Sequence, residues 1–105
     1  MTYHLSFRIR KIYFDQIVAG AKTTEFRKAS PFWVHKVART KEALEKGETV
    51  IGVFLCGKEV HRRAVIGTSM YENAQEALGR DPSFQGAIDL GPGYVFGFHL
   101  GEVVI

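Results

Sequence analysis

A cation, an acid and a second cation lie within six residues of one another, at Lys22, Glu25 and Arg27. On an extended strand, Glu25 and Arg27 project from one face and Phe26 points the other way, toward the core. Lys22 has the parity of Phe26, so we expect it in the turn before the strand, with its aliphatic stem curled back toward Glu25. This spacing is typical of a surface ion-pair cluster that supports a turn. The alternative is anion recognition, in which Arg27 offers a planar fork to phosphate.

Two catalytic roles are conceivable for Lys22 and Glu25. A lysine acts as a base or nucleophile only where its surroundings favour the neutral amine, and the adjacent carboxylate of Glu25 favours the ammonium form instead. We therefore expect Lys22 to be an electrostatic anchor. For phosphodiester cleavage, Glu25 would be a general base toward a ribose hydroxyl, while Lys22 and Arg27 stabilise the developing negative charge.

A second basic group follows the most apolar segment of the chain and contains Lys58, His61, Arg62 and Arg63. On a strand, His61 and Arg63 share a face and Arg62 takes the other. One interpretation is a charged hairpin end that keeps the sheet soluble. The other is a phosphate-binding patch that is continuous with Arg27, Lys28, Lys36 and Arg39, whose affinity would fall steeply with salt.

Aromatic residues make up 12% of the chain, and the periodicity assigns most of them to the core. Trp33 is ambiguous, because it follows Ser30-Pro31 at the start of a predicted helix. It is either a packing anchor or a stacking platform for an unpaired base. Tyr71, just past a strand end, is a weaker candidate of the same kind. The core candidates are Phe7, Phe14, Phe26, Phe54, Phe96 and Phe98.

Metal and nucleotide-cofactor sites are not indicated by the sequence. The four histidines, at positions 4, 35, 61 and 99, are scattered, and no pair has i, i+4 spacing. The Gly-rich phosphate loops of nucleotide-binding folds are absent from the sequence. We expect no metal and no cofactor, and we expect the single cysteine, Cys56, to be a small core residue in a reducing, cytoplasmic setting.

The composition, with 46% hydrophobic and 24% charged residues over 105 positions, predicts one globular domain spanning residues 1–105. No apolar run approaches the ~20 residues of a membrane span, and the N-terminal charges do not read as a secretory signal. Residues 1–63 hold 13 Lys or Arg against 6 Asp or Glu, whereas residues 64–105 hold 1 against 5. This asymmetry indicates a positive face that could meet a polyanion or simply be a solvated basic surface.

The first half of the chain predicts two strands and two helical regions. Polar and apolar residues alternate from Tyr3 to Arg10, as on a half-buried strand, and helical spacing follows over about residues 12–19 with Gly20 as the C-cap. A second strand is expected at Thr23–Lys28. Ser30-Pro31 then begins a helical region that ends at Gly47, either as one helix or as two with a second N-cap at Thr40.

The second half predicts three more strands. Thr49–Cys56 is rich in β-branched residues and is expected to be buried on both sides, with an antiparallel partner over Val60–Ser69. A polar helix over Asn73–Leu78 and a loop from Asp81-Pro82 to Gly91-Pro92-Gly93 precede an alternating final strand over Tyr94–Leu100. Five mostly antiparallel strands with two to four short helices predict an α+β fold, a small closed or nearly closed β-barrel.

The segment Gly20-x-Lys22-x-x-Glu25-x-Arg27, with a strand and the helix 13–19 before it, resembles the G-x-K-x-x-E-x-R signature of ASCH domains. These domains are small barrels of the PUA-like superfamily, and the predicted order of elements is similar over nearly the whole chain. The resemblance implies RNA or modified-nucleoside binding in a cleft lined by the signature residues. Around it we expect a binding set of Lys22, Glu25, Arg27, Lys28, Trp33 and Arg63.

Some ASCH domains are reported as metal-independent ribonucleases, and one branch hydrolyses the amide of acetylated cytidine with a lysine, a threonine and a glutamate. Here Glu25 occupies the position of that threonine, which weakens the amidohydrolase interpretation. A remote acid would be Glu72 or Glu76. The first hypothesis is therefore an RNA-binding module, the second a metal-independent hydrolase with Lys22 and Glu25 as catalytic residues, and the third a protein-interaction module.

Overall fold

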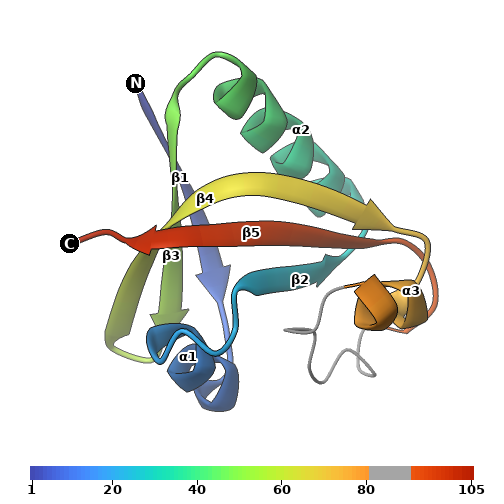
Figure 1. Cartoon of the computed structure of the whole chain (residues 1–105), viewed down its shortest axis with the longest axis horizontal. Helices are drawn as coiled ribbons and strands as arrows, with labels where there is room; N and C mark the ends of the chain where they lie inside the picture. Colours follow the sequence, from blue (N-terminus) through green and yellow to red (C-terminus); the bar gives the residue numbers. More distant parts are fainter. Residues whose placement is uncertain (81–90) are drawn as a thin grey trace.

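The computed structural model describes residues 1–80 and 91–105 and contains a five-stranded sheet with three helices (Figure 1). Much of the predicted loop that begins at Asp81-Pro82 lies outside the described residues. Within them, no helix is both long enough and apolar enough to cross a membrane. The elements in chain order are β1 (Thr2–Arg8), α1 (Lys11–Val18), β2 (Thr24–Lys28), α2 (Pro31–Glu45), β3 (Thr49–Cys56), β4 (Glu59–Tyr71), α3 (Ala74–Arg80) and β5 (Val95–Val103).

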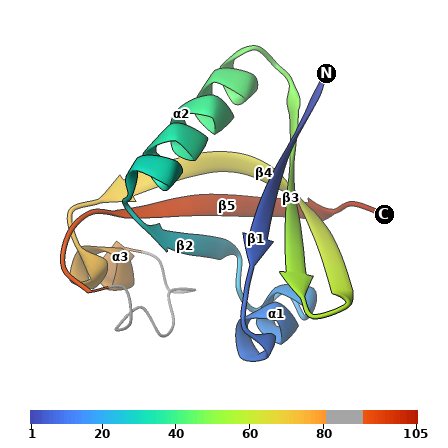
Figure 2. The ribbon, with the colours of Figure 1, turned by 180° about the vertical axis from the view of Figure 1, so that it is seen from behind.

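The sheet has the strand order β1-β3-β4-β5-β2, so β1 and β2 form its two edges. Three of the four pairings are antiparallel, as predicted, and β1 pairs with β3 in parallel. The expected closure into a barrel is wrong, because no strand pairing joins β1 to β2 in the described chain. The end of β1 nevertheless lies beside the start of β2 when the molecule is seen from either side (Figures 1 and 2). A side-chain hydrogen bond, and not backbone pairing of the two strands, connects β1 and β2 on this open side of the sheet.

The helix α2 is one continuous helix of 15 residues. Its N-cap is Ser30, whose hydroxyl accepts a hydrogen bond from the backbone N–H of Trp33, and Pro31 occupies the first helical position as the sequence predicts. The alternative of a second start at Thr40 is wrong. The hydroxyl of Thr40 donates to the Lys36 carbonyl one turn earlier, which satisfies it inside the helix.

The main hydrophobic core lies between α2 and one face of the sheet. Phe7 is fully buried at its centre, and its ring stacks on Trp33 at 5.4 Å and on Phe54 at 5.0 Å between centroids. Phe98 meets the Phe7 ring edge-on at 5.2 Å. Because these rings come from β1, α2, β3 and β5, they hold the edge strand β1 against the middle of the sheet.

A smaller core lies on the opposite face of the sheet, where α3 covers one end. It contains Phe26, Tyr71, Ala77 and Val95. Phe26 therefore points away from the main core, contrary to the expectation from the sequence, and Glu25 and Arg27 project on the side of the main core. The strand alternation is as predicted, but alternation cannot say which of the two faces carries the larger core.

Replacement of Phe7 by Ala should lower the free energy of unfolding by about 3–5 kcal/mol, because it leaves a cavity among the rings of Trp33, Phe54 and Phe98. The measurement is urea denaturation followed by circular dichroism. The matched control is Phe32→Ala on the same helix as Trp33, since Phe32 is 59% exposed. Equal losses for the two variants would contradict the assignment of Phe7 to the centre of the core.

Candidate anion and nucleic-acid site

The turn between α1 and β2 places Lys22 at the free edge of the sheet. Gly20 has a positive φ of 79°, and the backbone N–H groups of Ala21 and Lys22 both donate to the Gln16 carbonyl, which reverses the chain after the helix. The Lys22 ammonium then turns back, as predicted, to lie 3.3 Å from Glu25 Oε1. It also donates to the carbonyl of Thr24 and lies 5.1 Å from the centre of the Phe26 ring.

The Glu25 carboxylate is buried between two cations. Lys22 is paired with its Oε1. Arg27 donates to its Oε2 through Nε at 2.9 Å, and Nη2 lies 2.8 Å from the same oxygen as an ion pair. The side chains of Lys22 and Glu25 are 5% and 6% exposed. Since both oxygens are engaged and water is largely excluded, Glu25 is suited to hold cations in place and poorly placed to accept a proton from a substrate.

Arg27 bridges the open side of the sheet. Its Nη2 donates to the carbonyl of Arg8, the last residue of β1, at 3.1 Å. Its guanidinium carbon also lies 5.3 Å from the centre of the Phe7 ring and 5.1 Å from that of Trp33. A guanidinium can satisfy an acid, a carbonyl and two aromatic faces at once, because it is planar and carries five donors.

These interactions satisfy backbone groups that a closed barrel would have paired. The carbonyl of Thr23 accepts from the N–H of Leu100 in β5. The next carbonyl, that of Thr24, therefore points away from β5 toward the open edge, where Lys22 meets it. The carbonyl of Arg8 is met in the same way by Arg27. We call Lys22, Glu25 and Arg27 the edge cluster.

The edge cluster carries two positive charges and one negative charge, so its formal net charge is +1. Ion pairs with little access to water are stable only when every charge has a partner. The side chain of Arg27 is 21% exposed, so it is the member of the edge cluster that is most accessible to solvent. An anion bound at Arg27 would balance this excess positive charge.

An aromatic strip continues from the edge cluster onto the start of α2. Trp33 lies between the guanidinium of Arg27 and the ring of Phe32, which it contacts edge-on at 5.1 Å. Phe32 is exposed, and the Lys36 ammonium lies 5.3 Å from its centroid. The sequence left Trp33 open as a packing anchor or a stacking platform; its ring stacks on Phe7, as expected of a packing anchor, and the more exposed ring is that of Phe32.

The other predicted site residues do not gather at the edge cluster. Lys28 is exposed at the far end of β2. Arg63 donates to the carbonyls of Gly101 and Ile17, so it braces α1 against β5. Burial, together with the charge of Arg63, lowers the pKa of His61, which therefore adds little positive charge to this region at neutral pH.

The two candidate remote acids lie at the start of α3. The carboxylate of Glu76 accepts a hydrogen bond from the backbone N–H of Glu72. The backbone N–H of Glu76 donates to the side-chain oxygen of Asn73. These bonds are those of a helix cap. Within the part of the chain that the structure describes, no hydrogen bond or ion pair joins Glu72 or Glu76 to the edge cluster, and no group of three metal-ligating side chains forms.

A second polar group, which the sequence analysis did not identify, lies on the opposite face of the sheet. Thr24 Oγ1 is 3.3 Å from Nδ1 of His99, and Ser69 Oγ is 2.6 Å from Nε2 of the same ring. These residues are 75 and 30 positions from His99 along the chain. The strand alternation placed His99 on the polar face of the last strand, but only the pairing of β5 with both β2 and β4 brings the two hydroxyls to it.

The fold is that of an ASCH domain. The chain is similar to the crystal structure of a serine-to-alanine mutant of ZmASCH from Zymomonas mobilis, with a TM-score of 0.67 and 14% sequence identity, over 94% of this chain and 68% of that chain. No family model and no curated protein matches the sequence. At this identity the likeness establishes the arrangement of strands and helices alone. It confirms the ASCH-type arrangement that the signature predicted, without the expected closure of the described strands into a barrel.

The ion pairs of the edge cluster should contribute unequally to stability. In Glu25→Gln, two cations lose their partner, and we expect a loss of about 3 kcal/mol. In Lys22→Met, the Glu25–Arg27 pair remains, and the loss should be about 1–2 kcal/mol, mainly from the unsatisfied Thr24 carbonyl. Thermal and urea denaturation of both variants and of the double variant measure this. Strict additivity in the double variant would contradict a direct interaction between Lys22 and Glu25.

Proposed function

We propose that the chain is an RNA-binding domain that holds single-stranded RNA, or a nucleoside within it, against the edge cluster and the aromatic strip. One observation carries the proposal: a largely buried charge cluster with a net charge of +1 adjoins an exposed ring, Phe32, through Arg27 and Trp33. Single-stranded nucleic acids are bound by this combination of positive charge along the backbone and aromatic faces under the bases.

In this proposal the roles of the residues follow from their exposure. Arg27 and Lys22 supply the positive potential, and Glu25 fixes the position of both without contacting the RNA. Phe32 stacks on a base, and Trp33 supports its position. Lys28, exposed at the other end of β2, attracts a neighbouring phosphate, and Arg63 adds positive potential from its place between α1 and β5. The ASCH-type fold supports the choice of RNA, because the PUA-like superfamily is associated with RNA.

Binding should depend on salt and on Lys22 specifically. For single-stranded RNA, each phosphate contact contributes about 0.7 to the slope of log affinity against log salt concentration. Lys22→Met brings the net charge of the edge cluster from +1 to zero, so we expect the phosphate contact at Arg27 to be lost, binding to weaken and the slope to fall by about 0.7. Fluorescence anisotropy with a labelled 12-nucleotide RNA at 50–300 mM KCl measures both quantities.

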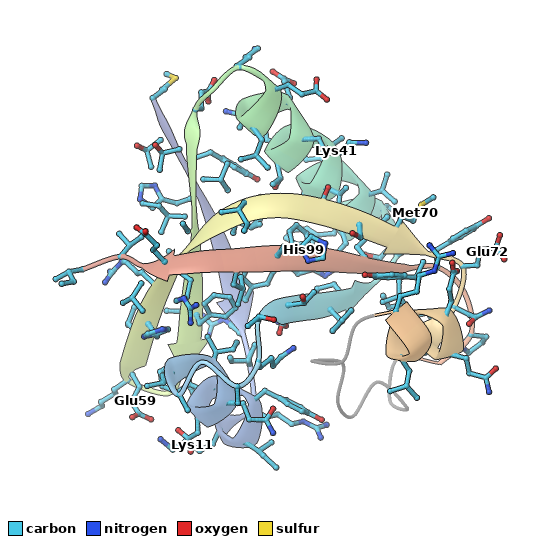
Figure 3. All side chains as sticks on the ribbon, viewed as in Figure 1. Lys11, Lys41, Glu59, Met70, Glu72 and His99 are labelled. Atoms are coloured by element: carbon cyan, nitrogen blue, oxygen red, sulfur yellow. The ribbon has the colours of Figure 1, made fainter. Side chains whose placement is uncertain are left out.

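The matched control for this experiment is Lys41→Met, since Lys41 is an exposed lysine on α2 at a distance from β2 (Figure 3). It removes the same charge from the protein and should leave the slope unchanged. Identical losses in the two variants would show that only net charge matters, and an affinity independent of salt would contradict phosphate binding altogether.

The hydrolase alternative is tested in the same samples. With both oxygens of Glu25 paired to cations, we expect RNA to be retained but not cleaved, with or without EDTA. Gel analysis of the bound RNA after long incubation reads cleavage directly. Cleavage that resists EDTA and disappears in Lys22→Met or Glu25→Gln would overturn the binding-module proposal in favour of a metal-independent ribonuclease. If the RNA is neither retained nor cleaved, the result favours the protein-interaction module.

A further inference from the structure

The polar group on the second face of the sheet has the arrangement of an activated nucleophile. Ser69 Oγ lies 2.6 Å from His99 Nε2, and the other ring nitrogen, Nδ1, lies 3.3 Å from Thr24 Oγ1. A hydroxyl, a base within hydrogen-bond distance and a third group that orients the base are the parts that nucleophilic catalysis requires. We propose that Ser69 is a nucleophile activated by His99, and that this pair transfers the acyl group of short-chain carboxylic esters.

The orientation of the imidazole is fixed by buried structure. Thr24 is 2% exposed and is the cross-strand partner of His99, so its hydroxyl cannot move away from Nδ1 without disturbing β2. With the ring proton on Nδ1 and donated to Thr24, Nε2 has a lone pair that accepts the Ser69 hydroxyl proton. Thr24 is thus a positioning residue, and Ser69 and His99 are the reacting pair.

The reacting pair is reachable from solvent. Ser69 and His99 are both half-buried. Ser69 lies two residues before the end of β4, and Figure 3 shows His99 at the centre of β5. Their cross-strand partners are glycines: Gly67 is opposite His99, and Gly97 is opposite Ser69. Among the described residues, a Cβ at Gly67 would have only the His99 ring within 4 Å, which leaves room for a small acyl group beside the imidazole. The space over Gly97 is already filled by the side chains of Thr24, Phe26 and Tyr71.

The proposed reaction balances without an added cofactor. The Ser69 oxygen attacks the ester carbonyl carbon as its proton passes to His99 Nε2, and a tetrahedral intermediate forms. The bond from carbon to the leaving oxygen then breaks, and His99 returns the proton to the departing alcohol. Water, deprotonated by His99, hydrolyses the acyl-serine and releases the carboxylic acid.

The competing explanation is that the two hydroxyls only satisfy a histidine within the sheet. That role leaves Ser69 with the reactivity of an ordinary serine, whereas a base in contact with it raises reactivity by about 10²–10⁴. Ser6, exposed on β1, provides the unactivated reference in the same molecule. Reactivity of Ser69 relative to Ser6 therefore separates the two explanations.

The experiment treats the full chain with a fluorophosphonate probe, which forms a bond from serine oxygen to phosphorus as the phosphorus–fluorine bond breaks. Mass spectrometry of peptides then gives the labelling rate of each serine. We expect Ser69 to react at least 100-fold faster than Ser6, and to lose this advantage in His99→Gln and in protein unfolded by urea. Release of p-nitrophenol from p-nitrophenyl acetate should fall to the uncatalysed background in Ser69→Ala and remain unchanged in Ser6→Ala.

The role of Thr24 is tested by Thr24→Val, which should slow labelling of Ser69, and by Thr24→Ser, which should restore it. Labelling of Ser69 within tenfold of Ser6 in the folded wild-type chain overturns the proposal, and this result does not depend on whether any variant folds. The outcome is also independent of RNA binding, because it is measured without RNA.

Discussion

The carboxylate of Glu25 forms ion pairs with two cations, Lys22 and Arg27, and the open side of the sheet depends on this arrangement. Lys22 lies in the turn before β2, and Arg27 lies in β2, two residues after Glu25. Each cation has a second partner, the Thr24 carbonyl or the Arg8 carbonyl, on the unpaired edges of β2 and β1. Without the carboxylate, two cations of like charge would lie close together with little water to separate them.

This arrangement gives the signature residues a structural reason that is separate from any ligand. A sheet edge must be paired, covered or charged, and here charged side chains take the hydrogen-bonding role of a missing strand pairing. The functional reason is that the three charges do not cancel. Each cation satisfies one carbonyl at the open edge, but the single carboxylate balances only one of the two positive charges. The remaining charge is the one to which our proposal assigns an anionic ligand.

The features that the sequence predicted are those with short-range causes. Strand and helix positions follow from periodicity, the start of α2 from Ser30-Pro31, and the meeting of Lys22 with Glu25 from a turn and a spacing of three residues. The features that it could not predict depend on long-range pairing. Whether the sheet closes is decided by β1 and β2, which are neighbours only after folding, and the contact from Arg27 to Arg8 spans 19 positions.

The same limit explains the two residues that were missed or misplaced. His99 gave no signal as one of four scattered histidines, because its partners lie on two other strands. Phe26 was assigned to the main core, since alternation says that it opposes Glu25 but not which face α2 covers. A charged pair on the side of the main core is unusual, and only the aromatic faces of Phe7 and Trp33 make that side suitable for a guanidinium.

Thr24 links the two faces of the sheet, because its carbonyl accepts from Lys22 while its hydroxyl meets His99. It belongs to β2, a strand of five residues whose one strand partner among the described residues is β5. Short edge strands with one neighbour are the parts of a sheet that open most readily. The edge cluster supplies the second support of this strand, so the position of Thr24, and with it the orientation of the His99 ring, depends on charges on the other side of the sheet. An anion bound at Arg27 would add to that support, and the hydroxyl–imidazole chain would be most rigid when the edge cluster is occupied.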